Sequence, residues 1–134
     1  MHFLLACLFV EKNLVLVEGV MMNHYIADSA RLGKEIKVGG NTIIMDEAVI
    51  GNHCQIGNNV VIHPGTYIGD NVRIDDDTVI GKKPLSSPRS IFKTPEELEP
   101  AIIGANTQIG ANVIIYAQCK IGASNLIADL ATIR

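Results

Sequence analysis

The chain carries an aliphatic residue at every sixth position from residue 26 onward. The residues in this register are Ile26, Leu32, Val38, Ile44, Ile50, Ile56, Ile62, Ile68, Ile74 and Ile80, and, after an interruption, Ile103, Ile109, Ile115, Ile121, Ile127 and Ile133. Since 40 of the 134 residues are Ile, Leu or Val, ten consecutive matches have a chance probability on the order of one in 10^5. A period of six fits neither a helix nor simple strand alternation. It predicts a stacked repeat in which each unit buries its apolar side against its neighbours.

Each six-residue unit is predicted to hold one short strand and one corner. Four residues after each aliphatic position stands a small or β-branched residue, as at Thr42, Cys54 and Thr66. That residue and the next aliphatic one are two apart, so both side chains leave the same face of a strand and point inward. The residues between are rich in Gly, Asn and Asp, which tolerate the positive φ that a sharp corner needs.

The residues that directly follow the aliphatic positions vary with a period of eighteen, or three units. One corner has Gly33, Gly51, Gly69, Gly104 and Gly122, whereas another has Ala27, Met45, His63, Gly81, Tyr116 and Arg134. Three corners per turn predict an all-β triangular prism of about five coils, stacked at the usual strand spacing of about 4.8 Å. The phase continues across the interruption, so residues 82–102 are expected to form a loop excursion from one corner rather than a domain boundary.

Two stretches carry a resemblance to a known family. "IGNHCQIGNNVVIHPGTYIGDNVRIDDDTVIGKKP" and "IGANVIIYAQCKIGASNLIADLATIR" resemble the hexapeptide-repeat acyltransferases, in particular the N-terminal part of CoA-dependent acetyltransferases that act on sugar nucleotides and similar small amines or hydroxyls. The resemblance spans roughly residues 22 to 134. It implies a left-handed parallel β-helix, whereas crossover sterics alone favour the right-handed form. It also implies acetyl-CoA or another acyl-CoA as co-substrate and a homotrimer with its active site between two prisms.

Composition and charge exclude several classes of partner. The net charge is −3 and no basic stripe is present, which argues against nucleic acid, because phosphate contacts dominate such binding. The apolar run of residues 3–10 is far shorter than the about 20 residues of a membrane span. A cytoplasmic protein without a membrane anchor is therefore expected.

Cys54 and Cys119 take inward positions on different coils and are expected to be free buried thiols.

The two ends of the chain depart from the repeat. Residues 1–21 are expected to be either a β-hairpin, with a turn at residues 11–13, that caps the prism or a non-native extension before a start at Met21 or Met22. The repeat continues to the final residue with no cap after it, although bare strand edges invite association. Residues 22–134 are therefore expected to be a β-helix that is incomplete at its C-terminus.

His63 is the candidate catalytic base, on the glycine-poor corner. In the resembling family a corner histidine takes the proton of the acceptor amine or hydroxyl while a backbone N–H stabilises the oxyanion. The eighteen-residue stacking predicts that His63 shares an edge with Tyr116 and the base of the excursion, with Glu47 one coil below to orient the imidazole. The alternative is that His63 has no chemical role and that coils absent from this chain supply the base.

The excursion contributes the candidate cofactor ligands. Its basic first half offers Lys82, Lys83 and Arg89 to the phosphates of CoA, and its length suggests an arm that reaches a neighbouring subunit. The sequence Thr94-Pro95-Glu96-Glu97 predicts a single helical turn in its second half.

Two other classes of function remain open. The γ-type carbonic anhydrases share the prism but need three histidines around zinc, whereas only His53 and His63 lie in the repeat, on different corners, so no metal is expected. The second class is a non-catalytic scaffold or assembly module, in which the prism only presents flat faces to partners.

Overall fold

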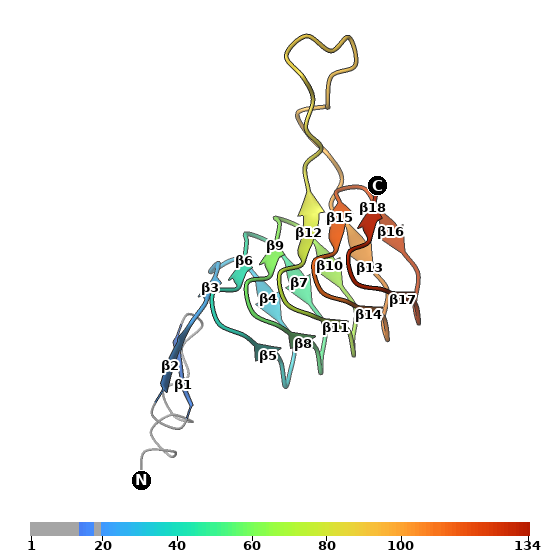
Figure 1. Ribbon diagram of the computed structural model, residues 1–134. Coiled ribbons are helices and arrows are strands. Elements are labelled where there is room, and N and C mark those ends of the chain that lie inside the picture. The colour runs from blue at the N-terminus through green and yellow to red at the C-terminus, as the bar shows by residue number, and fades with distance from the viewer. Residues whose placement is uncertain (1–13, 18–19) are drawn as a thin grey trace.

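The computed structural model describes residues 14–17 and 20–134, with side chains from Asn23 onward, and Figure 1 shows their arrangement. Sixteen short strands form three parallel sheets, which are the three faces of a prism. Face 1 contains β3 (Tyr25–Ile26), β6 (Ile43–Ile44), β9 (Val61–Ile62), β12 (Val79–Lys82), β15 (Ile114–Tyr116) and β18 (Thr132–Ile133). Face 2 contains β4 (Arg31–Leu32), β7 (Val49–Ile50), β10 (Tyr67–Ile68), β13 (Ile102–Ile103) and β16 (Lys120–Ile121). Face 3 contains β5 (Lys37–Val38), β8 (Gln55–Ile56), β11 (Arg73–Ile74), β14 (Gln108–Ile109) and β17 (Leu126–Ile127).

The strands of each face pair with strands one coil away in the predicted register. Ile44 lies beside Ile62, and Ile80 lies beside Ile115 across the interruption. With three strands per coil, the sixteen strands make slightly more than five coils of a left-handed parallel β-helix. The predicted fold class and coil number are confirmed.

The interior of the prism consists of stacked aliphatic columns. Ile44, Ile62, Ile80 and Ile115 have no solvent-exposed surface, and each lies at the second residue of its strand. The preceding residue of each strand points outward, because successive side chains of a strand alternate between its two sides. A repeat of only two strand residues and one inward corner residue thus builds a continuous core.

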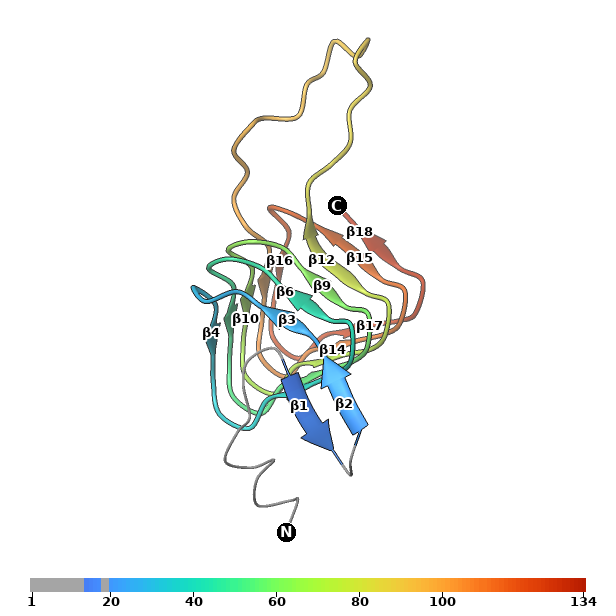
Figure 2. The same cartoon turned by 90° about the vertical axis from the view of Figure 1, so that its left-hand side faces the viewer.

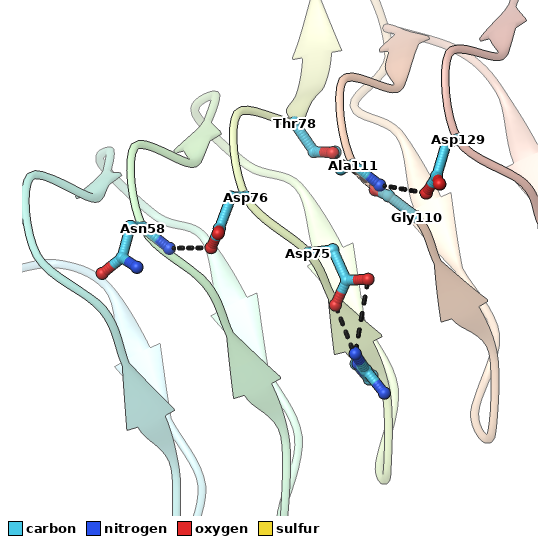
Figure 3. A network of polar contacts seen from close by, with 8 residues as sticks. Asn58, Asp75, Asp76, Thr78, Gly110, Ala111 and Asp129 are labelled. Carbon is cyan, nitrogen blue, oxygen red and sulfur yellow. Dashed lines mark hydrogen bonds and ion pairs between the residues drawn. The ribbon is translucent and has the colours of Figure 1, made fainter.

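The corner glycines do not have the role that the sequence predicted, which was to adopt positive φ. Among the described residues, positive φ falls on the third corner residue, frequently an asparagine such as Asn59 or Asn71, and only Gly65 and Gly81 have it among the glycines. The corner asparagines and aspartates also bond between coils: the Asn58 N–H donates to Asp76 Oδ1 at 2.7 Å (Figure 3). A Cβ at Gly57 would stand 2.3 Å from the same oxygen. Glycine is therefore required by the close approach of the next coil.

This explanation predicts that replacing Gly104 by alanine is costly while the same change at Gly122 is not. A Cβ at Gly104 would lie 2.4 Å from the carbonyl carbon of Gly122 and 2.5 Å from the Ala123 nitrogen, which are backbone atoms that cannot move aside. At Gly122, on which no described coil stacks, the nearest atom is Asn125 Nδ2 at 3.7 Å. We expect Gly104→Ala to lower the free energy of unfolding by about 1–3 kcal/mol. Urea denaturation of both variants measures this, and equal stabilities would contradict the close-approach explanation.

The excursion leaves the prism where β12 ends at Lys82 and returns where β13 begins at Ile102. We call residues 83–101 the arm, and Figures 1 and 2 show it projecting away from the coils. The predicted position of the arm is confirmed. The prediction of a helical turn over residues 94–97 is wrong, since no helix forms there. The Thr94 hydroxyl donates to the Pro84 carbonyl across the arm at 3.4 Å instead of capping a helix. A turn of four residues does not outweigh this pairing because helix nucleation is unfavourable.

The N-terminal segment contains an antiparallel hairpin. β1 (Leu14–Val17) pairs with β2 (Val20–Asn23), next to the first coil in Figures 1 and 2. Residues 3–10 and the turn predicted at residues 11–13 lie outside the described residues, so the cap and the non-native extension both remain predictions. No helix in the described part of the chain is long and apolar enough to cross a membrane.

Candidate functional site

The glycine-poor corners stack into one edge, which we call the His63 edge. It is built from the corners that begin at Ala27, Met45, His63, Gly81, Tyr116 and Arg134. Backbone bonds set this stacking: the Met45 N–H donates to the Ile62 carbonyl at 3.0 Å, and the His63 N–H donates to the Ile80 carbonyl at 2.9 Å. Lys82 lies beside Tyr116 in the strand register. The predicted juxtaposition of His63, Tyr116 and the base of the arm is therefore confirmed.

A hollow of about 300 Å³ lies on this edge, between the prism and the base of the arm. We call it the His63 hollow; its lining residues are His63, Pro64, Gly81, Lys83, Glu96, Leu98, Pro100 and Ala117. The Lys83 ammonium donates to the Glu96 carbonyl oxygen at 3.4 Å and so ties the two halves of the arm together. The excursion thus encloses the candidate base on one side.

His63 is suited to accept a proton. Its imidazole is half-buried, and burial together with the nearby Lys82 ammonium lowers its pKa below the ordinary value. The imidazole is consequently neutral at pH 7, with a nitrogen lone pair free to act as a base.

We predict that Lys82→Gln raises the pKa of His63 toward its ordinary value, because a positive charge that disfavours the imidazolium is removed. Titration of the His63 ring protons by NMR measures the pKa without any substrate. Lys83→Gln is the matched control and should change the pKa less, since burial and Lys82 are the causes of the shift. An unchanged pKa in Lys82→Gln would contradict this electrostatic explanation.

Tyr116 organises the C-terminal half of the edge. Its ring has the Lys82 ammonium at 5.2 Å and the Arg134 guanidinium at 4.8 Å from the ring centre, both within the range of cation–π attraction. The Arg134 guanidinium also donates to the Tyr116 hydroxyl at 3.4 Å. With Lys83, these groups make this end of the edge basic. The role of Arg134 was missed from the sequence, although its distance of eighteen residues from Tyr116 places the two on one corner.

The structure brings some predicted site residues together and separates others. Lys82 and Lys83 lie at the base of the arm near His63, whereas Arg89 lies in the middle of the arm along the chain and does not line the hollow. Glu47 is exposed one coil below His63 and does not line the hollow, and its backbone N–H donates to the Ser29 hydroxyl oxygen at 3.0 Å. The predicted orienting contact between Glu47 and His63 is not among the hydrogen bonds of the described residues.

Glu96 is a further candidate that sequence reasoning did not single out. It lines the hollow together with His63 and Lys83. The signal was present in the sequence, since a basic first half and an acidic second half of one excursion attract each other across its base.

Thr66 breaks a hydrogen-bond pattern at the base of the arm. Elsewhere the inward threonines bond to the next coil: the Thr78 hydroxyl donates to the Gly110 carbonyl at 2.7 Å and accepts the Val113 N–H at 3.2 Å. Thr66 is fully buried, yet its hydroxyl has no partner in the described structure. The corner that should supply the acceptor begins at Gly81, whose φ of 85° directs the chain into the arm.

We therefore predict that valine is tolerated at position 66 but not at position 78. Thr66→Val removes a hydroxyl that has no partner, so stability should be unchanged or higher. Thr78→Val leaves the partly buried Gly110 carbonyl and the buried Val113 N–H without this partner and should lower the free energy of unfolding by about 1–3 kcal/mol. Thermal unfolding of the two variants measures the difference, and an equal loss in both would show that the Thr66 hydroxyl is bonded.

No group of three or more His, Cys, Asp or Glu residues that could hold a metal ion occurs in the described part of the chain. His53, on the glycine-rich corner, pairs with the Glu35 carboxylate at 2.9 Å. Cys54 and Cys119 are both buried and free. The Cys54 thiol donates to the Gly69 carbonyl at 3.2 Å, and burial raises the pKa of this thiol.

The chain is similar in sequence to one protein family and in structure to a known acyltransferase. Residues 47–82 and 100–134 match the family described as "Bacterial transferase hexapeptide (six repeats)", and the gap between the two matches lies within the arm. The structure of LpxA, a UDP-N-acetylglucosamine acyltransferase from Bacteroides fragilis 9343, is similar with a TM-score of 0.71 and 28% identity. The similarity covers 81% of this chain and 43% of that chain, so this chain spans less than half the length of LpxA. No curated protein sequence matches.

Proposed function

Because this chain belongs to the bacterial transferase hexapeptide family, we propose that it is an acyl-CoA-dependent acyltransferase that uses acetyl-CoA or another acyl-CoA. The acceptor is an amine or hydroxyl of a sugar nucleotide or a similar small metabolite. Acyl transfer to a nucleotide-linked sugar is the activity named for the similar LpxA. The observation that carries the proposal is a half-buried, neutral His63 inside a hollow beside basic side chains.

In this mechanism His63 is the general base. Its imidazole takes a proton from the acceptor amine or hydroxyl, and the freed nitrogen or oxygen attacks the thioester carbonyl. The new C–N or C–O bond forms as the C–S bond breaks, and the CoA thiolate takes up the proton from the imidazolium. Lys82, Lys83 and Arg89 are proposed to meet the phosphates of CoA, and Glu47 is proposed to orient the imidazole. The protein acts as a cytoplasmic homotrimer.

The proposal is tested by incubating the full chain with acetyl-CoA and an amino sugar nucleotide and measuring the release of the CoA thiol. Isothermal titration with acetyl-CoA alone gives an independent readout of cofactor binding. Release of the thiol that depends on the acceptor is expected. A folded chain that neither binds acetyl-CoA nor releases the thiol would overturn the proposal in favour of a non-catalytic scaffold or assembly module.

A further inference from the structure

The arm carries an apolar surface that its own chain leaves uncovered. Leu85, Ile91 and Phe92 are exposed over 89%, 88% and 80% of their surface, and we call them the arm tip. The backbone around them is held in place locally, since the Lys93 ammonium donates to the carbonyls of Ser87 and Pro88 at 3.2 and 2.7 Å. Three large apolar residues grouped on a short projecting segment are typical of a contact surface.

The arm tip stands beyond the prism to which it belongs. Residues 83–101 run outward and back, which allows about nine residues, or about 30 Å, in each direction. One face of the prism is about six residues wide, or about 20 Å. Figures 1 and 2, at right angles to each other, both show the arm pointing away from the coils. A partner beside the prism is therefore within reach of the arm tip.

The outward side chains of the three faces differ in polarity. Face 1 presents an almost continuous apolar column of Tyr25, Ile43, Val61, Val79 and Ile114. Face 2 presents a shorter apolar column that lies between two basic residues, Arg31 and Lys120. Face 3 presents Lys37, Gln55, Arg73 and Gln108 before Leu126. Face 1 is thus the longest apolar surface of the prism.

Face 1 also has acidic groups beside it. It is bordered by an acidic corner, residues 75–77, and Figure 3 shows that Asp75 is engaged by Arg73 while Asp76 accepts the Asn58 N–H. Asp77 is exposed at this corner and has no ion pair within the described structure. On the arm, Arg89 is likewise exposed, next to the arm tip in sequence, and its guanidinium has no ion pair among the described residues. An apolar surface with an adjacent acidic corner complements an apolar tip with an adjacent arginine.

We propose that the arm of one copy of this chain lies across face 1 of a second copy. The arm tip packs on the column around Val61 and Val79, and Arg89, when no CoA phosphate engages it, approaches Asp77 at the acidic corner. Each copy offers both surfaces, so the contact is head-to-tail and repeats around a closed ring. The inference rests on the homo-oligomer in the proposed function and is independent of acyl transfer, because association is measured without substrate.

Sedimentation equilibrium of the full chain tests the apolar part of the contact. We expect Phe92→Ser to weaken association by about tenfold or more. Leu126→Ser is the matched control, since Leu126 on face 3 is also 80% exposed, and it should associate like the parent. If Phe92→Ser associates like the parent oligomer, the arm contact is overturned while the homotrimer stands. If the parent is a monomer at all concentrations, both are overturned.

A charge exchange and a cross-link test the choice of face. Arg89→Glu should weaken association by about two- to fivefold, and combining it with Asp77→Arg should restore it, which a folding defect would not do. With Cys7→Ser as background, Phe92→Cys together with Val61→Cys should give covalent oligomers with a short bis-maleimide. Phe92→Cys with Gln55→Cys, on face 3, should not. Equal cross-linking of both pairs, or no rescue by Asp77→Arg, would overturn the assignment of face 1.

Discussion

Replacing Ile103 by alanine is expected to lower the free energy of unfolding by about 2–5 kcal/mol. Ile103 is fully buried and stacks between Ile68 and Ile121, its partners on the neighbouring coils of face 2. Each side of a coil contributes only one inward strand residue and one inward corner residue, so the coils above and below cannot collapse into the cavity without breaking their own register. The loss should therefore include a cavity contribution in addition to the lost burial.

Ile102→Ala is the control for this prediction. It makes the same chemical change one residue away, at an outward position that is 37% exposed, so the loss should be much smaller. Urea denaturation followed by circular dichroism compares the two variants. Similar losses would contradict the division into inward and outward positions from which the fold was argued.

Replacing His63 by asparagine is expected to lower kcat/KM for acyl transfer by about 10²–10⁴-fold. Asparagine cannot take the acceptor proton at neutral pH, whereas the hollow and the arm should remain in place. His53→Asn is the matched control, because His53 occupies another corner with a φ of 58°, which asparagine tolerates. An unchanged rate in His63→Asn would support the alternative in which His63 is a corner residue and another group is the base.

The pH dependence of the same reaction provides a second check. The base must be neutral, so kcat/KM should fall as the pH falls through the pKa of His63. Burial and the Lys82 ammonium lower that pKa, which moves the loss of activity to a lower pH than for an unperturbed histidine. Lys82→Gln raises the pKa and should move the loss toward higher pH. A movement in the opposite direction would contradict the assignment of His63 as the base.

Much of the site followed from the repeat alone, as His63 and Tyr116 illustrate. Once the period of eighteen was known, their positions on one edge were determined, because each coil must pair in register with the next. The base of the arm was placed by the same counting. The helical turn over residues 94–97 was predicted incorrectly because local helix signals were weighed without Pro84, whose carbonyl takes the Thr94 hydroxyl.

The contacts of the arm could not be counted in this way. Glu96 enters the hollow because the arm folds back across its own base, and the chain has no period there to show it. The missing partner of Thr66 depends on the backbone direction at Gly81. Glycine at the corners was expected to serve positive φ, but the neighbouring coil, which a single unit does not contain, is the actual reason.

The sequence by itself determined the coils, the inward columns, the three corners and the place where the chain leaves the prism. These are consequences of a regular spacing, and a stacked repeat has only one register that buries every aliphatic residue. Only the tertiary structure decided which groups meet at the His63 hollow, how the pKa of His63 is lowered and which surfaces remain uncovered. Those properties arise from distances between segments that lie far apart along the chain and share no period.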